Sequence, residues 1–278
     1  EYAICDTQIK IFSGFKQTPM VVNNYAKHLW SGTLLGASVG GGVEFYEWES
    51  GSLVRRIEVK AKDVKWFGDL VAIMTKTEIH ILQYNPDCSE QLEEGGYDDA
   101  FQLVQQIDVA ADSMIWASSV LIFTEGPRVS MFVGEFTQHI TTMKGPVTIL
   151  NYLSKENMLV VTDSDQHIFG ISLPQTLLDF LAAVINEEEV DISAVPEEFR
   201  NNTSKFLKQV GKKELALQLA TDNSIRFELA LELGNLDVAK ETAPDSVSWQ
   251  RLAKTAISLG NSTLAIEALQ RSGDLQTL

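Results

Sequence analysis

The sequence is short of cysteine and of long hydrophobic runs. Its 2 cysteines, Cys5 and Cys88, have no companion at the spacing of a metal-ligand set. A disulfide framework and a zinc site are therefore not expected, and a reducing, cytosolic compartment fits best. The longest candidate span, Thr176–Ile185, is interrupted by Asp179 and is too short to cross a bilayer. Because no signal-peptide pattern opens the sequence either, we expect a soluble protein.

Basic residues are also scarce. Lysine and arginine together number 22 against 38 acidic residues, which gives a formal net charge of −16. The acids cluster in residues 87–99 and 187–198, and we expect both runs to be solvated loops. A surface of this sign repels phosphate backbones and anionic lipid. Direct binding to nucleic acid or to a membrane is therefore disfavoured, whereas a basic partner is compatible with the charge.

The sequence lacks a catalytic constellation. It has no Gly-x-Ser-x-Gly elbow, and no histidine lies near a cysteine along the chain. We interpret the four histidines as strand residues that are isolated from possible ligands: His28, His80, His139 and His167. We therefore predict no catalytic, metal-binding or cofactor-binding residues, and a protein that is not an enzyme.

Two short motifs resemble ligand sites without completing them. Gly40–Gly42 lacks the lysine and the following Ser or Thr of a phosphate-binding loop, and it is predicted to be a turn between strands. Asp163 and Asp165 suggest a calcium loop, but no acid stands at its twelfth position. Asp and Ser side chains accept hydrogen bonds from their own backbone in turns, so a hairpin turn is the better interpretation.

The first part of the chain contains a repeat of β type. Aromatic residues open four units at intervals of 36, 50 and 36 residues: Trp30, Trp66, Trp116 and Tyr152. An apolar strand is predicted after each of them, over residues 34–39, 70–74, 120–123 and 158–161. A second strand follows after a turn, over residues 43–48, 78–84, 128–133 and 166–171. This spacing is typical of propeller blades, and residues 2–4 and 9–12 add strands of an incomplete blade. We expect the rings of Trp66 and Trp116 to be at least partly buried.

Near Pro174 the period changes from that of strands to that of helices. Apolar residues fall on one stripe over residues 177–185, and a second helix is expected between Pro196 and Val210. We therefore predict two domains. Residues 1–173 form the C-terminal blades of a WD40-like β-propeller, and residues 174–278 form the N-terminal part of an α-solenoid of TPR-like helical pairs.

The helical part carries its own repeat. Three glycines follow apolar helix ends and stand five residues before an alanine: Gly211, Gly234 and Gly260, with Ala216, Ala239 and Ala265. Glycine tolerates the left-handed conformation in which many helices end, so we predict helix stops there and a close helix crossing at each alanine. Residues 274–278 begin a further helix, and we expect Leu275 and Leu278 to be covered by further helices or by a partner.

Short segments in both parts are similar to one family. Arg226–Leu236, followed by Val238–Ala239, resembles the helical-pair signature of the large propeller-and-solenoid subunits of the COPI vesicle coat, coatomer. Further similar segments lie in the first part of the chain: Glu1–Ile4, Ile9–Phe12, Leu34–Gly36, Phe45–Trp48, Leu53–Glu58 and Asp98–Phe101. The matches at residues 1–16 and 55–58 favour the beta-prime branch of the family over the alpha branch, which is its nearest rival.

The resemblance implies a structural scaffold subunit of the COPI coat, which acts in Golgi-to-ER and intra-Golgi transport through protein–protein assembly. It implies the coatomer alpha subunit and other coat subunits as partners. It also implies a cytoplasmic location, with peripheral association on Golgi membranes and COPI-coated vesicles through the coat. The acidic run at residues 87–99 is longer than the family pattern. The family's first propeller, which binds dilysine signals, has no counterpart in this sequence, so no cargo-binding residue is carried over.

Two other classes of function stay open at this point. Fold alone does not fix an assembly, so the chain is also compatible with the alpha subunit or with a clathrin-like, intraflagellar or nuclear-pore scaffold. An enzyme hosted on the propeller is the third class. It is disfavoured because no base, nucleophile or metal set is present in the sequence.

Overall fold

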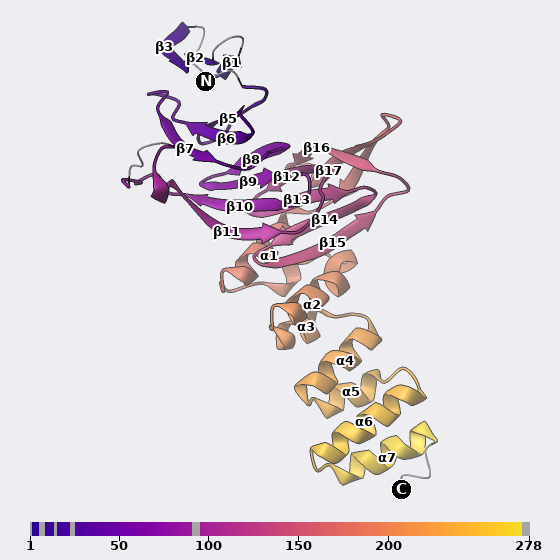
Figure 1. Ribbon diagram of the computed structural model, residues 1–278. Helices are drawn as coiled ribbons and strands as arrows, with labels where there is room; N and C mark the ends of the chain where they lie inside the picture. The colour runs from indigo at the N-terminus through magenta and orange to yellow at the C-terminus, as the bar shows by residue number, and fades with distance from the viewer. Residues whose placement is uncertain (1, 6–8, 14–15, 23–25, 91–94, 274–278) are drawn as a thin grey trace. The chain divides into compact units, whose positions relative to one another are not determined.

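The computed structural model describes residues 2–5, 9–13, 16–22, 26–90 and 95–273 (Figure 1). The chain divides into two compact units, Glu1–Ala182 and Ala183–Leu278, and each is described by itself. Within the described residues, the first unit consists mainly of antiparallel sheets and the second of paired helices. The predicted order of blade-like sheets followed by helical pairs is confirmed.

Each sheet of the first unit is built from strands that follow one another along the chain. Three sheets have four strands. The first contains β4 (Leu29–Trp30), β5 (Leu35–Val39), β6 (Gly42–Tyr46) and β7 (Leu53–Ile57), and the second contains β8 (Asp63–Phe67), β9 (Leu70–Met74), β10 (Ile79–Tyr84) and β11 (Phe101–Ile107). The third contains β12 (Ser113–Ala117), β13 (Val120–Glu125), β14 (Arg128–Val133) and β15 (Phe136–Thr142). Two sheets have three described strands: β1 (Tyr2–Cys5), β2 (Ile9–Ser13) and β3 (Lys16–Val22); β16 (Val147–Leu153), β17 (Met158–Asp163) and β18 (Ile168–Ser172). The predicted Gly40–Gly42 turn is confirmed, because Gly40 and Gly41 join β5 to β6 with positive φ angles of 57° and 93°.

The repeating aromatic residues lie at the end of a strand rather than before one. They are the last or the penultimate residues of β4, β8, β12 and β16: Trp30, Trp66, Trp116 and Tyr152. The prediction that they open the units is therefore wrong, and the strands predicted as first and second are the second and third of their sheets. In β8 the charged residues Asp63 and Lys65 interrupt the apolar run that would predict a strand. Both Trp66 and Trp116 are half-buried, as predicted.

The outer strands β7, β11 and β15 were not predicted either. In β11 most side chains are exposed or half-buried, and the strand mixes glutamine with Leu103 and Val104. β15 is exposed or half-buried along its whole length. An outer strand with little burial has no strict alternation of apolar and polar residues, so its period is weak in the sequence. Pairing with the neighbouring strand decides its conformation.

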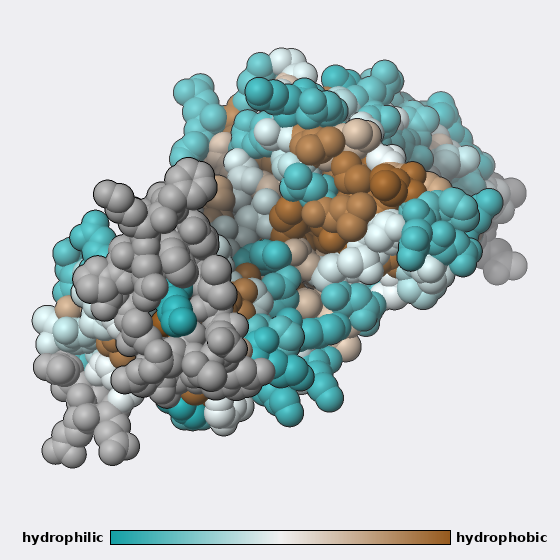
Figure 2. Space-filling view, turned by 90° about the horizontal axis from the view of Figure 1, so that it is seen from above, coloured by the Kyte–Doolittle hydropathy of each residue, from teal (hydrophilic) through white to brown (hydrophobic). Residues whose placement is uncertain are grey.

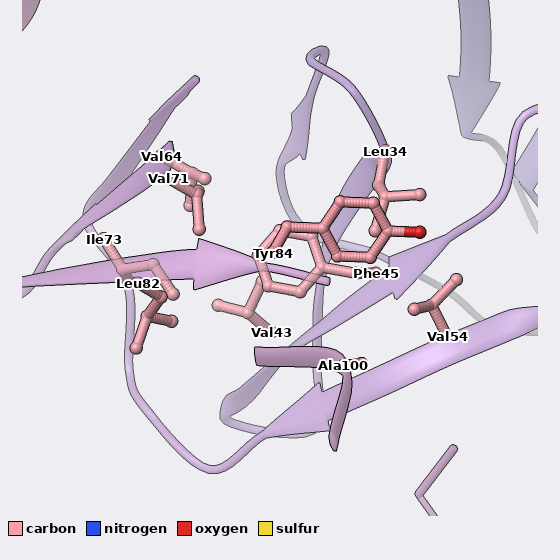
Figure 3. Close-up of a cluster of buried hydrophobic side chains, with 10 residues drawn as sticks. All are labelled: Leu34, Val43, Phe45, Val54, Val64, Val71, Ile73, Leu82, Tyr84 and Ala100. Atoms are coloured by element: carbon pink, nitrogen blue, oxygen red, sulfur yellow. The ribbon is translucent and has the colours of Figure 1, made fainter. Parts of the chain in front are cut away.

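Hydrophobic layers fill the space between successive sheets. Figure 3 shows one such layer, with side chains from the β4–β7 sheet facing side chains from the β8–β11 sheet: Leu34, Val43, Phe45, Val54, Val64, Val71, Ile73, Leu82, Tyr84 and Ala100. Strand β9 serves two layers, because Val71 and Ile73 point into this one while Ala72 and Met74 point into the next. Each fully buried apolar side chain of this kind stabilises the fold by about 1.5–3 kcal/mol.

Contacts between first strands bring the sheets together. β8 contacts both β4 and β12, and β12 contacts β16. The Trp116 indole links two of these strands, since its Nε1 donates a hydrogen bond to the Lys65 carbonyl at 3.1 Å. The first strands of successive sheets therefore lie beside one another, which is the arrangement of inner strands in propeller blades.

The acidic segment at residues 87–99 is only partly a solvated loop. Residues 91–94 lie outside the described residues, and 95–97 pair with the edge strand β7. The Tyr97 amide donates to the Val54 carbonyl at 2.7 Å, and the Arg56 amide donates to the Gly95 carbonyl at 2.8 Å. The prediction of a free loop is corrected here, because an edge strand offers unpaired backbone groups that a neighbouring segment can satisfy.

Helix α1 (Gln175–Ile185) is separated from the end of β18 by two residues, Leu173 and Pro174, and spans the border between the two compact units. It buries Leu177, Leu178 and Leu181 on the predicted stripe. The second unit continues with α2 (Arg200–Gln209), α3 (Lys213–Leu219), α4 (Asn223–Leu233), α5 (Leu236–Thr242), α6 (Ser246–Ser258) and α7 (Ser262–Ser272). Helices α2 and α3, α4 and α5, and α6 and α7 pack as pairs.

The predicted glycine stops are confirmed. Gly211, Gly234 and Gly260 have φ angles of 89°, 69° and 75°. The alanines that follow them in the next helices are buried, with exposed fractions of at most 4%: Ala216, Ala239 and Ala265. At one of these crossings the Ser204 hydroxyl on α2 donates to the Ala216 carbonyl on α3 at 2.8 Å. The predicted helix with Leu275 and Leu278 lies outside the described residues.

Side-chain caps begin four of the helices. The side chains of Asp222, Asn235, Asp245 and Asn261 accept hydrogen bonds from amides in the first turns of α4, α5, α6 and α7. A cap of this kind is worth about 1 kcal/mol. These caps fix where α4, α5, α6 and α7 start.

Candidate interaction surface

Three of the four histidines have only local partners. His80 lies in β10, with its Nε2 3.1 Å from the Glu78 carboxylate. His139 lies in β15, with its Nε2 3.2 Å from the Thr142 hydroxyl. His28 precedes β4, and its ring centroid is 6.0 Å from that of Trp30. Each of these side chains lies in or beside a strand, next to one polar or aromatic neighbour.

His167 is not isolated. Its side chain, with those of Asp163 and Asp165, places one potential ligand atom each within 4.8 Å of the others. The expectation that every histidine is isolated from possible ligands is therefore wrong at this position, because the turn between β17 and β18 brings residues four apart together. The Asp163 carboxylate accepts hydrogen bonds from the Asp165 and His167 amides at 2.9 Å each, as expected for a hairpin turn.

The same hydrogen bonds account for the electrostatics of that turn. Partial burial opposes ionisation of Asp163, but hydrogen bonds from His167 and Asp165 outweigh it and hold the Asp163 pKa below its usual range. Asp165 and His167 are exposed. The Asp163 carboxylate thus finds its hydrogen-bond donors within the turn, and the turn lies at the surface of the sheet.

Two groups that could carry chemistry are restrained by their surroundings. Glu44, in β6, is 5% exposed, and it accepts hydrogen bonds from Arg56 Nη1 at 2.8 Å and from the Tyr46 hydroxyl. Cys88 is half-buried against the layer in Figure 3, and burial, together with the negative charge of Asp99, raises the pKa of its thiol. A thiol whose pKa is raised is a poor nucleophile.

A hollow of about 320 Å³ lies where strands β8, β12 and β16 meet. Its two lysines are held by nearby acceptors. Lys62 Nζ donates to the Ala111 carbonyl at 3.0 Å and lies 3.7 Å from Asp112, and Lys65 Nζ lies 3.4 Å from Asp63. The charges of this hollow are therefore already balanced by its own lining.

Apolar side chains are exposed on the last sheet of the first unit. In β18, Ile168 is 68% exposed and Phe169 is 38% exposed, and Leu150 in β16 is 51% exposed. No described strand pairs with the outer edge of β18. Exposed apolar side chains beside an unpaired strand edge are available for contact with protein.

The face turned to the viewer in Figure 2 also carries hydrophobic side chains gathered among hydrophilic ones.

The second unit exposes apolar residues on helices α6 and α7 and at Leu259, which directly follows α6. Four of them are close to half exposed or more: Val247, Ile257, Leu259 and Ile266. The polar face of the same unit carries ion pairs that join successive helical pairs, with Glu232 on α4 bound by Lys208 on α2 at 2.6 Å and by Lys213 on α3 at 3.0 Å. Lys240 on α5 likewise binds Glu267 on α7 at 2.7 Å. This unit offers an extended surface rather than a closed pocket.

None of the helices in the described ranges is both long and apolar enough to cross a membrane. The arrangement is suited to binding other proteins, since its exposed features are apolar residues on a sheet edge and on paired helices. Neither surface was predicted from the sequence. An exposed apolar residue in a strand or helix cannot be told from a buried one in the sequence, because its exposure is known only from the structure.

Two family models match the chain in succession. The family described as COPA/B second beta-propeller matches residues 1–163, and the one described as COPA/B TPR domain matches residues 185–278. Coatomer subunit beta' of Rattus norvegicus is 32% identical over 294 aligned residues, covering 99% of this chain and 32% of that protein. Coatomer subunit beta'-1 of Arabidopsis thaliana is 31% identical over 291 residues, covering 98% of this chain and 32% of that protein. The chain thus spans about a third of the length of these curated relatives.

Proposed function

The chain belongs to the coatomer beta-prime family, and we propose that it forms part of a structural scaffold subunit of the COPI vesicle coat. In this proposal it acts in Golgi-to-ER and intra-Golgi transport through protein–protein assembly. Residues 1–173 are the C-terminal blades of the second propeller, and residues 174–278 begin the solenoid. The observation that carries the proposal is the match of both family models, in this order, to sheets followed by paired helices.

The surfaces of the two units support a scaffold role. Propeller sheets and ion-paired helices give a surface whose shape is fixed by packing, and the exposed apolar residues of α6 and α7 are available for contact. The family is one of coat scaffolds and not a known enzyme family. That this chain catalyses no reaction and holds no cofactor or metal is part of the proposal.

We propose the coatomer alpha subunit as the direct partner, with other coat subunits joining through it. Because the chain assembles into the coat in this proposal, it is located in the cytoplasm and associates peripherally, through the coat, with Golgi membranes and COPI-coated vesicles. The alternatives raised by the sequence, the alpha subunit itself and other propeller-and-solenoid scaffolds, are not favoured, because the relatives described above are named beta-prime.

Co-elution with the cognate coatomer alpha subunit tests the proposal. We expect the chain and the alpha subunit to elute together in size-exclusion chromatography with light scattering. The double substitution Ile257→Glu and Leu259→Glu should weaken the complex, since it places two charges among the exposed apolar residues of α6. Lys254→Glu is the matched control, because it adds a glutamate at another exposed position of the same helix.

A chain that stays monomeric with the alpha subunit would contradict the proposed partner. Imaging of the labelled protein tests the location separately. Golgi-associated puncta are expected, whereas a nuclear rim or a ciliary pattern would overturn the assignment to the COPI coat.

A further inference from the structure

A groove of about 500 Å³ opens between helices of the second unit. It is lined from α3, α4 and α5, with Leu217, Leu233 and Val238 as its apolar part. Arg226 on α4 lines the same groove, and Glu214 on α3 is an exposed residue of its lining. A guanidinium beside apolar side chains is the combination that binds a carboxylate with an apolar neighbour.

The Arg226 guanidinium has no acceptor within the part of the chain that the structure describes. Its Nε is buried and has no hydrogen-bond partner. No described carboxylate lies within ion-pair distance of its side chain, whereas two other arginines of this unit bind acids, Arg251 with Glu228 and Arg271 with Glu267. A partly buried guanidinium without an acceptor loses hydration and gains nothing in return, so it destabilises the fold.

The charges of the groove limit what can occupy it. The lining carries one negative charge, on Glu214, and one positive charge, on Arg226. Arg226 is therefore the single positive group of the lining that an incoming ligand meets. A carboxylate with one charge suits this balance better than a phosphate with about two. The apolar lining favours a side chain such as leucine next to that carboxylate.

We propose that this groove binds a segment of a partner protein in which an aspartate or glutamate stands beside an apolar residue. The carboxylate of the segment accepts hydrogen bonds from the outer Nη groups of Arg226, since Nε is covered by the chain itself, and the apolar residue contacts Leu217, Leu233 and Val238. Glu214 repels the acidic segment and thereby weakens non-specific acidic binding. This inference goes beyond the scaffold role proposed above, because it names a binding site and the chemistry of its ligand.

Selection from a displayed library of random peptides against the whole chain tests the proposal. We expect the enriched peptides to carry an acid next to an apolar residue, and to lose binding when Arg226 is replaced by methionine. In fluorescence polarisation with one enriched peptide, replacing its acid by the matching amide should weaken binding about tenfold, the loss expected for one charge-assisted contact. Glu214→Gln should strengthen binding of the same peptide, since it removes the repulsion.

A stability measurement separates a binding role from a structural one. If Arg226 contributes to binding and not to stability, Arg226→Met leaves the melting temperature of the free chain unchanged or raises it, because the substitution removes a desolvated charge. A melting temperature lowered by Arg226→Met would overturn the proposal. So would enriched peptides without an acid, equal binding to Arg226→Met, or the failure of any peptide to be enriched. None of these results bears on the COPI role, which co-elution with the alpha subunit tests separately.

Discussion

Arg251 on α6 binds Glu228 on α4 with two hydrogen bonds, one of them 2.7 Å long from Nη2 to Oε2. Its guanidinium carbon also lies 5.8 Å from the centre of the Phe227 ring. This contact joins two consecutive helical pairs across the polar face of the second unit. An arginine that donates two hydrogen bonds to one carboxylate fixes the distance between the two side chains and their orientation. The pair therefore contributes to the spacing of the stacked helical pairs.

The first prediction concerns this ion pair. A double-mutant cycle of Arg251→Ala and Glu228→Ala should give a coupling below about 1 kcal/mol, because both side chains are more than a third exposed and solvent screens them. Hydrogen bonds from Arg251 hold the pKa of Glu228 below its usual range. A carboxyl with a depressed folded-state pKa stabilises the fold above its unfolded-state pKa, near 4.3, and loses this as pH falls through the folded value.

Urea unfolding of the four variants at neutral pH and below about pH 4 measures that coupling. The coupling should be present at neutral pH and fade in acid. High salt should also reduce it, since exposed charges are screened. Coupling that persists unchanged at low pH would mean that Arg251 acts through packing against Phe227 instead.

The second prediction concerns the segment that pairs with β7. Gly96 has a φ of +93°, and a Cβ there would stand 2.1 Å from the Val54 carbonyl oxygen. Gly95 has a φ of +96° with nothing within 4 Å of a Cβ, so Gly95→Ala is a matched control. Gly96→Ala should be more destabilising than Gly95→Ala by at least about 1 kcal/mol, as is typical of a steric clash with backbone. Denaturant unfolding gives the difference, and faster hydrogen exchange at the Tyr97 amide should accompany it.

The third prediction concerns the cap of α6. The Asp245 carboxylate accepts a hydrogen bond from the Ser248 amide at 2.8 Å, and this bond holds the Asp245 pKa below its usual range. Asp245→Ala should destabilise the chain by about 1 kcal/mol at neutral pH. Because the folded-state pKa is depressed, this contribution is present above the unfolded-state pKa, near 3.9, and is lost as pH falls through the folded value.

Asp245→Asn is the control for that cap. Asparagine caps helices about as well as aspartate but does not titrate, so this variant should keep most of the stability and lose the cap's pH dependence. Circular dichroism melts between neutral pH and about pH 3 compare the three proteins. Equal pH dependence in Asp245→Asn and the parent chain would rule out Asp245 as the titrating group.

The fourth prediction concerns the helix crossing at Ala239. This residue of α5 is fully buried and packs in the core of the second unit. Ala239→Leu should cost about 1–3 kcal/mol, because a close-packed crossing has no room for three more carbon atoms. Glu241→Leu, at an exposed position of the same helix, should change stability by less than about 0.5 kcal/mol. Similar melting temperatures for the two variants would show that the crossing is loose.

The fifth prediction concerns the turn formed by Asp163, Asp165 and His167. We expect no stoichiometric metal, because internal hydrogen bonds already explain the position of Asp163 and its two neighbours are exposed. Isothermal titration of the chain with Zn²⁺ and with Ca²⁺ checks this. Uptake of one equivalent that disappears in His167→Ala would show that the turn is a metal site after all.

Local patterns in the sequence were enough to identify the type of most elements. The apolar runs of β9 and β13 predict strands, because a central strand is buried on both faces and is therefore apolar along its length. The stripe in α1 and the glycines 211, 234 and 260 marked helices and their ends, because the left-handed stop is a property of glycine itself. The order of propeller sheets before helical pairs followed from the change of period near Pro174.

Tertiary structure decided what depends on partners distant in sequence. The outer strands and the pairing of residues 95–97 with β7 form because a neighbouring strand offers free hydrogen-bonding groups, and this leaves no periodic pattern in the sequence. The groove around Arg226 likewise depends on burial and on the position of every nearby carboxylate. The sequence alone thus determined the buried strands, the helix ends and their order, because these depend on local residue patterns. Burial and pairing between distant segments decided the outer strands and which surfaces are left for binding.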